Sequence, residues 1–266
     1  MIKKNFISIL ITNYNKERFL KKNLLSVVNQ NFKNYEIILF DDHSTDSSLN
    51  IIKKFKKFKR IKLFRNLKIN NKKSPPINQI KGIIKAFKQS KGDVICLLDS
   101  DDTFKKNKLK IISSFFKKNL NKEFVVNFPN TKNSFHLKKI NPDQSIWPTI
   151  FPTSCISFRR NFFENYLKYI NKNKFYNLEI DARLLIYAYH YCEDVNIISD
   201  KLTEYTKDEK GISSRYGKYS LNWWLKRHEA FEYLLFILKK KKKFFIFTFD
   251  YYLTKFVNFL IRTTIR

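Results

Sequence analysis

The chain has 266 residues and a formal net charge of +30, from 53 Lys and Arg against 23 Asp and Glu. This length can bury one large core or two modest ones, and no Pro-, Gly- or Ser-rich linker divides the sequence. The basic residues are spread from Lys3 to Arg266 and are not gathered in one segment. We therefore expect solvated lysine faces and no specific nucleic-acid partner, although a basic surface favours anionic substrates and anionic membranes.

The cysteines and the first residues indicate the compartment. Cys96, Cys155 and Cys192 lie far apart without a CxxC spacing, which predicts buried thiols in a reducing environment. The start of the chain runs directly into a strand-like segment and lacks the longer apolar stretch of a signal peptide. We therefore expect a cytoplasmic protein.

Apolar runs alternate with segments of helical periodicity in the first half of the chain. Strands are predicted at residues 6–11, 35–40, 61–64 and 93–98, and helices at about residues 16–30, 44–58 and 74–90. Ser44 is the expected N-cap of the second helix, and Ser74 followed by two prolines starts the third. Strict alternation of strand and helix predicts an α/β fold with a mainly parallel sheet covered on both faces.

The string DSDD, residues 99–102, follows the apolar run of the fourth strand. Three carboxylates in four residues repel one another, so a positive group should lie between them. A divalent metal that carries phosphate is the natural candidate. The alternative is an acidic turn that caps a helix beginning near Phe104.

Two other strands end in polar strings, TNYN at residues 12–15 and DDHSTD at residues 41–46. The carboxyl ends of parallel strands lie on one side of a sheet, so the three strings can meet around one ligand. The flat ring of Tyr14, the amide side chains and an isolated carboxylate suit a nucleobase and a ribose, while DSDD suits a metal-bridged diphosphate. Helix capping would account for one of Asp41 and Asp42, but hardly for both.

These three strings, in this order and spacing over about residues 5–120, resemble the nucleotide-sugar half of family 2 glycosyltransferases with the GT-A fold. The resemblance implies a nucleotide-sugar donor, most often a uridine diphosphate (UDP) sugar, with Mg²⁺ or Mn²⁺ on the diphosphate. It places Asp101 and Asp102 closest to the metal. The residues that it places at the donor are Thr12, Tyr14, Asn15, Asp42, Asp99 and Asp101.

Residues 177–185 resemble the segment of the same family that carries the catalytic base, with Asp181 at the position of the base. An inverting transfer needs a carboxylate to take the proton from the attacking hydroxyl of a glycan or lipid-linked acceptor. Glu179 is the second candidate for this role. The alternative is that Asp181 only caps its helix or pairs with Arg183 on an amphipathic helix.

The chain also departs from the family pattern. The usual Ala-Arg-Asn-x-Gly stretch is replaced by residues 76–82, so an arginine that often holds the diphosphate is missing. Lys72, Lys73 and Lys81 are candidates to replace it, as point charges without the guanidinium fork. His43 follows Asp42 where glycine or asparagine is more usual. These differences leave the identity of the donor open.

Later segments offer weaker signals. Strands are predicted at residues 124–128 and 153–158, and Trp147 could stack on an acceptor sugar or belong to the core. The polar residues 205–217 resemble the mobile loop that closes over the donor, from which Lys207 or Arg215 could reach the diphosphate. An ordinary solvent loop is the alternative.

We divide the chain into a catalytic domain at residues 1–217, with halves at about 5–120 and 121–217, and a helical C-terminal region at 218–266. That region holds a helix at residues 223–238, a lysine run at 239–243 and an apolar segment at 244–261. A polar stripe recurs at every fourth position of this segment and consists of Asp250, Thr254, Asn258 and Arg262. The charges of Asp250 and Lys255 argue against a helix that spans a membrane. We expect peripheral contact with the anionic inner face of the cytoplasmic membrane, or a helix packed on its own domain.

The sequence thus predicts an inverting, metal-dependent glycosyltransferase. A metal-dependent nucleotidyltransferase would also place aspartates after a sheet strand, but it would release pyrophosphate where a glycosyltransferase releases a nucleoside diphosphate. A non-catalytic basic module that binds nucleic acid or membrane is the other alternative, and its binding would not depend on the aspartates.

Overall fold

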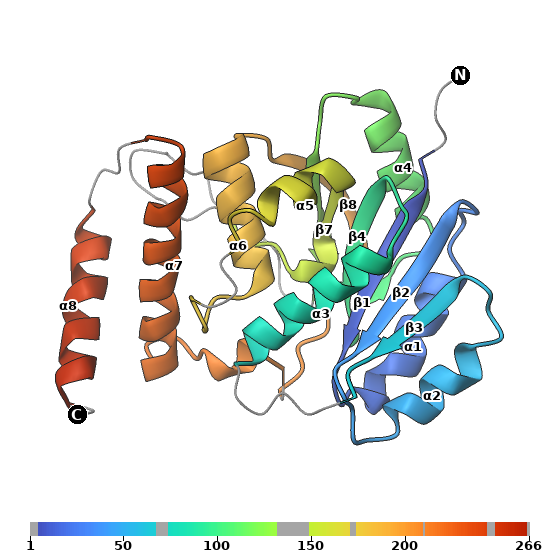
Figure 1. Cartoon of the computed structure of the whole chain (residues 1–266), viewed down its shortest axis with the longest axis horizontal. Helices are drawn as coiled ribbons and strands as arrows, with labels where there is room; N and C mark the ends of the chain where they lie inside the picture. Colours follow the sequence, from blue (N-terminus) through green and yellow to red (C-terminus); the bar gives the residue numbers. More distant parts are fainter. Residues whose placement is uncertain are drawn as a thin grey trace.

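The computed structural model describes residues 5–67, 74–131, 149–170, 174–209, 211–243 and 248–264. Within these ranges one sheet has the strand order β3-β2-β1-β4-β7-β6-β8-β5 (Figure 1). β1 pairs in parallel with β2 and β4, and β2 pairs in parallel with β3. β7 is antiparallel to both of its neighbours. The strand bounds are β1 Ile7–Asn13, β2 Tyr35–Asp41, β3 Ile61–Arg65, β4 Val94–Asp99, β5 Thr103–Phe104, β6 Phe124–Asn130, β7 Ile156–Arg159 and β8 Asn196–Glu204.

Helices cover both faces of this sheet. Side chains of β1 alternate between the faces, so that Leu10 joins one apolar cluster and Ile9 joins the other. α1, α2 and α4 pack on the side of Ile9, and α3, α5, α6 and α7 pack on the side of Leu10. The helix bounds are α1 Glu17–Val28, α2 Ser48–Phe55, α3 Pro75–Gln89, α4 Lys108–Lys118, α5 Arg160–Tyr166, α6 Ile180–Ile186, α7 Leu221–Lys240 and α8 Phe249–Thr264.

The predicted α/β fold with a mainly parallel first half is confirmed, and so are the strands and helices of that half. Ser74 caps α3 as expected and accepts a hydrogen bond from the backbone N–H of Ile77. All three cysteines are free, with Cys96 and Cys155 buried.

Three local predictions were wrong. Ser44 is not the N-cap of α2, because its hydroxyl binds Asp41 and the helix begins later, at Ser48. The helix expected near Phe104 begins at Lys108, and the two residues of β5 pair instead with β8. The acidic turn is therefore not a helix cap. Thr153 begins a 3₁₀ turn that precedes β7 and is not part of the strand.

The C-terminal helices differ in how they join the molecule. α7 contributes Phe231, Tyr233 and Leu234 to the apolar cluster that also holds Ile95 of β4. α8 is the outermost helix, packs alongside α7, and adds Tyr251 to the same cluster (Figure 1). None of the helices within the described ranges is both long and apolar enough to cross a bilayer.

A close approach of two backbone segments fixes the start of β4. The backbone N–H of Gly92 donates to the hydroxyl of Ser8 in β1 at 2.8 Å. A Cβ atom at position 92 would lie 2.5 Å from the backbone nitrogen of Ser8, closer than such atoms can approach. Glycine is therefore required at position 92, because there is no room for a side chain.

We expect Gly92→Ala to lower the free energy of unfolding by about 1–3 kcal/mol, the usual cost of forcing extra volume into a packed site. Chemical denaturation followed by circular dichroism measures this change. Gly217→Ala is the matched control, because a Cβ atom there meets nothing within 4 Å. Equal stability of the two variants would contradict the packing argument.

Candidate functional site

The polar strings at the ends of β1, β2 and β4 meet at one edge of the sheet. Thr12 lies opposite Phe40 of β2 on one side and opposite Asp99 of β4 on the other. Gly82 of α3 lies against this point, where an added Cβ atom would be 3.0 Å from both Thr12 and Phe40. The loops that follow the three strands therefore surround a common space.

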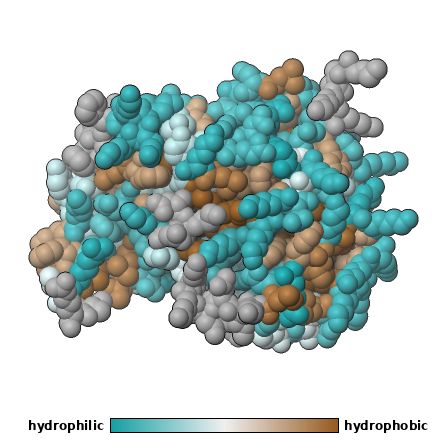
Figure 2. Space-filling model, viewed as in Figure 1, coloured by the Kyte–Doolittle hydropathy of each residue, from teal (hydrophilic) through white to brown (hydrophobic). Residues whose placement is uncertain are grey.

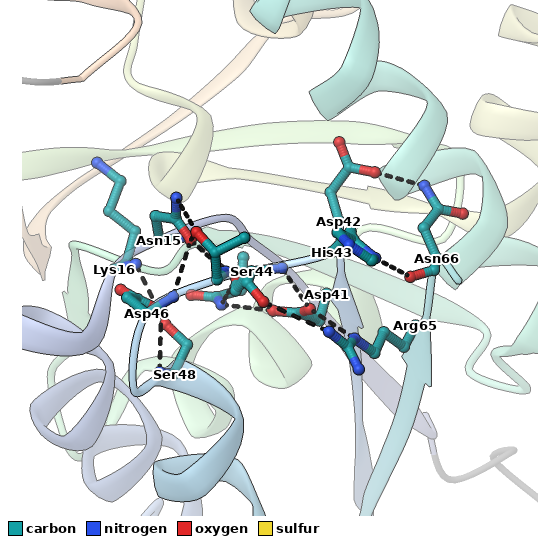
Figure 3. A network of polar contacts seen from close by, with 12 residues as sticks. Asn15, Lys16, Asp41, Asp42, His43, Ser44, Asp46, Ser48, Arg65 and Asn66 are labelled. Atoms are coloured by element: carbon teal, nitrogen blue, oxygen red, sulfur yellow. Dashed lines mark hydrogen bonds and ion pairs between the residues drawn. The ribbon is translucent and has the colours of Figure 1, made fainter. Parts of the chain in front are cut away.

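Asp41 holds two of these loops together and is fully buried. Its carboxylate accepts hydrogen bonds from the hydroxyl of Ser44 at 2.6 Å and from the side-chain amide of Asn13 at 2.8 Å (Figure 3). Arg65 approaches the same carboxylate at 3.6 Å. Asp41 is thus fully engaged in structure, which leaves Asp42 as the carboxylate of this pair that can face a ligand.

The Asp42 carboxylate points away from Asp41 and accepts a hydrogen bond from the side-chain amide of Asn66 (Figure 3). His43 next to it has a φ of 63°, in the left-handed region. This backbone conformation explains why glycine or asparagine is usual here, since few side chains tolerate it and histidine is among those that do.

The side chain of Tyr14 is exposed, whereas that of Asn15 is engaged in hydrogen bonds. The Tyr14 ring is 56% exposed at the edge of the sheet. Asn15 has a φ of 50°, and its side-chain oxygen accepts a hydrogen bond from the backbone N–H of Thr45 at 2.8 Å (Figure 3). Its own backbone N–H donates to Ser44 at 3.0 Å. The Asn15 amide therefore joins the β1 and β2 loops to each other.

Each carboxylate of the DSDD string has a different partner. Asp99 accepts a hydrogen bond from the amide of Gln79 at 2.7 Å. Asp101 forms an ion pair with Lys16 at 2.6 Å. Asp102 is buried and accepts a hydrogen bond from the backbone N–H of Thr206 at 2.8 Å. Contacts from α1, α3 and the segment after β8 thus converge on four residues.

Crowding and burial make this string costly to charge. Burial, followed by repulsion from Asp101 and Asp102, raises the pKa of Asp99 well above its usual range, and Asp181 adds to the effect. Burial and Asp101 likewise raise the pKa of Asp102 to about 7. The site holds more negative charge than its surroundings neutralise.

Two lysines supply positive charge, and sequence reasoning missed both. Lys16, which directly follows the TNYN string, bridges Asp101 and Asp208 with its ammonium group at 2.6 and 2.5 Å. Burial lowers the pKa of Lys16, but these two carboxylates more than offset it, so that the net change is upward. Lys108 is fully buried and donates to the carbonyl oxygen of Ser154 at 2.6 Å. Burial lowers its pKa to about 8.

Asp181 lies in the first turn of α6, on a segment far along the chain from DSDD. Burial, and then the charge of Glu179, raises the pKa of Asp181 to about 7, and Lys226 of α7 partly offsets this. Glu179 itself forms an ion pair with Lys226. Burial, followed by the charges of Asp102, Asp181 and Asp99, raises the pKa of Tyr205. The charge of Asp181 therefore acts on the same surroundings as the charges of the acidic string.

The donor atoms fit a hard divalent cation. They are the carboxylate oxygens of Asp101 and Asp102, and the Asp101 carboxylate already binds the ammonium group of Lys16. Within the described residues, no group of three His, Cys, Asp or Glu side chains is arranged to hold a metal without help. Mg²⁺ is commonly bound by one or two carboxylates together with the phosphates of a substrate, and Asp101 and Asp102 match that arrangement.

Other predicted residues are less closely tied to the site. Lys72, Lys73 and Trp147 lie outside the described residues. Lys207 and Arg215 are exposed in the segment between β8 and α7. Gln79 lies within the stretch that departs from the family pattern and binds Asp99. Its polarity on the buried face of α3 was the signal that could have identified it.

Comparison with known proteins gives the family. The sequence profile of Glycosyl transferase family 2 matches residues 8–184. An uncharacterized glycosyltransferase of Haemophilus influenzae is 40% identical over 116 residues, which cover 42% of this chain and 43% of that protein. The poly(ribitol-phosphate) beta-N-acetylglucosaminyltransferase TarP of Staphylococcus aureus is 34% identical over 125 residues, 45% of this chain and 35% of that protein. The matched segments thus span less than half of either relative.

Solved structures share the fold at low sequence identity. TarS of S. aureus in complex with UDP-GlcNAc superposes with a TM-score of 0.66 at 19% identity, covering 86% of this chain and 66% of that chain. The mannosyltransferase PcManGT of Pyrobaculum calidifontis, in complex with GDP-Man and Mn²⁺, gives 0.61 at 12% identity, covering 93% and 67%. With the sheet edge described above and a family profile that matches most of the sequence, the chain belongs to glycosyl transferase family 2 and has the GT-A fold.

Proposed function

We propose that this chain transfers a sugar from a nucleotide diphosphate, with UDP as the favoured nucleotide, to a hydroxyl group of a glycan or lipid-linked acceptor. The observation that carries the proposal is the convergence of Asp101, Asp102 and Asp181 on Asp99, whose pKa all three raise, at the carboxyl edge of the sheet. The divalent cation that accompanies a donor diphosphate would supply positive charge to this cluster. The names of TarP and of the TarS complex with UDP-GlcNAc support the same class of donor.

The proposed donor site follows the edge from β2 to β4. The exposed Tyr14 ring and Thr12 would contact the base and ribose, with the Asp42 carboxylate as hydrogen-bond acceptor and Asp99 near the ribose. Asn15 would act indirectly, because its amide joins the two loops that frame the base. Asp101 and Asp102 would hold Mg²⁺ or Mn²⁺, which when bound stabilises the charge of the leaving diphosphate.

Asp181 is the proposed base. In an inverting transfer the acceptor oxygen attacks the anomeric carbon as the bond to the diphosphate breaks, and its proton passes to a carboxylate on the opposite side from the leaving group. The raised pKa of Asp181, about 7, suits that task because the group can both accept and release a proton near neutral pH. Lys226 draws Glu179 into an ion pair, which leaves Asp181 as the better base.

We further propose that the chain acts in the cytoplasm, at the inner face of the membrane. The free thiols support a reducing compartment.

Asp101→Asn should abolish the Mn²⁺-dependent part of nucleotide binding, because it removes the charge of the proposed ligand. Isothermal titration calorimetry with UDP, with and without Mn²⁺, measures this. Asp200→Asn, which alters an exposed carboxylate on β8, is the matched control and should bind as the unaltered chain does. Undiminished Mn²⁺-dependent binding in Asp101→Asn would overturn the site assignment. Release of pyrophosphate in place of a nucleoside diphosphate would indicate a nucleotidyltransferase.

Asp181→Asn should keep metal-dependent donor binding and lower the rate of transfer by roughly 10² to 10⁴, the usual contribution of a general base. Glu179→Gln should cost much less. In the unaltered chain kcat should rise with pH up to about 7, because only the carboxylate form of Asp181 accepts a proton. The variant should lose that rise. Near-normal turnover in Asp181→Asn would refute the assignment, and a loss of thermal stability with preserved turnover would indicate a capping role.

Lys16→Met should bind Mn²⁺ more tightly than the unaltered chain in the absence of nucleotide, by about tenfold or more, because a competing cation next to Asp101 is removed. Electron paramagnetic resonance of free Mn²⁺ follows this binding without any turnover. Lys21→Met removes the same charge from an exposed position on α1 and is the control. Equal Mn²⁺ affinities of the two variants would show that Lys16 does not compete for the site.

A further inference from the structure

The polarity of α8 is reversed relative to an ordinary surface helix. A helix that packs on a soluble domain normally buries its apolar stripe and exposes its polar one. In α8 the apolar side chains face outward, with Phe256 59% and Phe259 64% exposed. The exposed apolar residues recur at helical spacing and form what we call the outer stripe: Phe249, Tyr252, Leu253, Phe256, Phe259 and Leu260.

The polar side of the same helix faces α7. Thr254 and Asn258 are 1% and 2% exposed. Asn258 donates from its side-chain amide to the carbonyl oxygen of Trp224 at 3.1 Å. Arg227 of α7 forms an ion pair with Asp250 and a hydrogen bond to the hydroxyl of Thr254 at 3.2 Å. The orientation of α8 is thus fixed by directional polar contacts, which would be lost if the helix rolled to bury the outer stripe.

Positive charge is concentrated in the chain segment that precedes α8. The lysines at residues 239–240 end α7, those at 241–243 follow it, and all five are exposed. On α8 itself, Lys255 and Arg262 are exposed beside the stripe. Glu193 forms ion pairs with Lys241 and Lys243 of this run. Apolar atoms reach the surface at the end of the molecule where α8 lies (Figure 2).

We propose that α8 lies in the plane of an anionic bilayer, with the outer stripe among the acyl chains and the neighbouring lysines on the phosphate headgroups. A helix with an apolar face, flanking Lys and Arg and exposed aromatic rings has the composition of such interfacial helices. Each basic residue near an anionic leaflet adds to the attraction. A second copy of this chain suits the stripe less well, because each copy carries a net charge of +30 and the two would repel each other.

Contacts of α7 link the proposed docking face to the proposed base. Lys226 of α7 holds Glu179, two residues before Asp181, and the adjacent Arg227 holds Asp250 of α8. A single helix therefore connects the bilayer face to the acceptor side of the site. This link to a lipid-linked acceptor rests on the proposed function, whereas lipid binding itself does not.

The test uses the full chain and vesicle flotation, which needs neither donor nor acceptor. The unaltered chain should float with vesicles that contain phosphatidylglycerol and should do so less with phosphatidylcholine alone or at high salt. The double variant Phe256→Asn/Phe259→Asn should lower the bound-to-free ratio about tenfold or more, since both rings are largely exposed and their loss should leave folding intact. Leu67→Asn/Leu120→Asn, at exposed apolar positions on other elements, is the matched control.

Three results would overturn the proposal. Equal flotation of the two double variants would remove the outer stripe from the interaction. Absence of flotation with anionic vesicles, with circular dichroism showing a folded chain, would exclude the bilayer. A concentration-dependent dimer in analytical ultracentrifugation that Phe256→Asn/Phe259→Asn dissociates, without vesicle binding, would assign the stripe to a second copy. If flotation fails while transfer activity remains, the proposed function stands without this surface.

Discussion

Repulsion among carboxylates at the carboxyl edge of the sheet is the constraint around which the chain is organised. Parallel pairing of β1 with β2 and β4 brings Asp42 and the DSDD string to one edge, and α6 adds Asp181. Each uncompensated negative charge at this edge destabilises the folded state, because burial and neighbouring charges both disfavour the ionised form of a carboxyl group. The surrounding elements provide amide, backbone N–H and ammonium donors that bind these carboxylates. Gln79, Thr206 and Lys16 come from three separate parts of the chain.

The same constraint separates the roles of paired residues. Asp41 and Asp42 are adjacent, yet one is enclosed by Asn13 and Ser44 while the other turns toward Asn66. Successive residues of extended backbone point to opposite sides, which separates the two side chains at the end of β2. Glu179 and Asp181 are also distinguished by their surroundings, because Lys226 forms an ion pair with Glu179. Two chemically identical carboxylates thus have different roles. Asp41 holds the loops together, and Asp42 is the one that can face a ligand.

The sequence alone was sufficient for the features that local patterns encode. Apolar runs of β1, β2 and β4 and the helical periods between them predicted the parallel sheet, and the polar strings do lie together at one edge of it, as predicted. Ser44 was misassigned because a serine before a helix and a serine that closes a loop onto Asp41 look alike in sequence. β5 was missed because a two-residue strand exists only through its pairing with β8. The stripe of α8 was visible, but its direction depends on Arg227 of another helix.

The bridge made by Lys16 has a consequence for the order of events at the site. One ammonium group holds both Asp101, in the acidic string, and Asp208, in the segment that follows β8. In the proposed function, a cation that binds Asp101 in place of Lys16 leaves the ammonium group to Asp208, so arrival of the metal would strengthen the hold of Lys16 on this segment. That ion pair would weaken as ionic strength rises, and so would the attraction of an anionic donor to the basic surface.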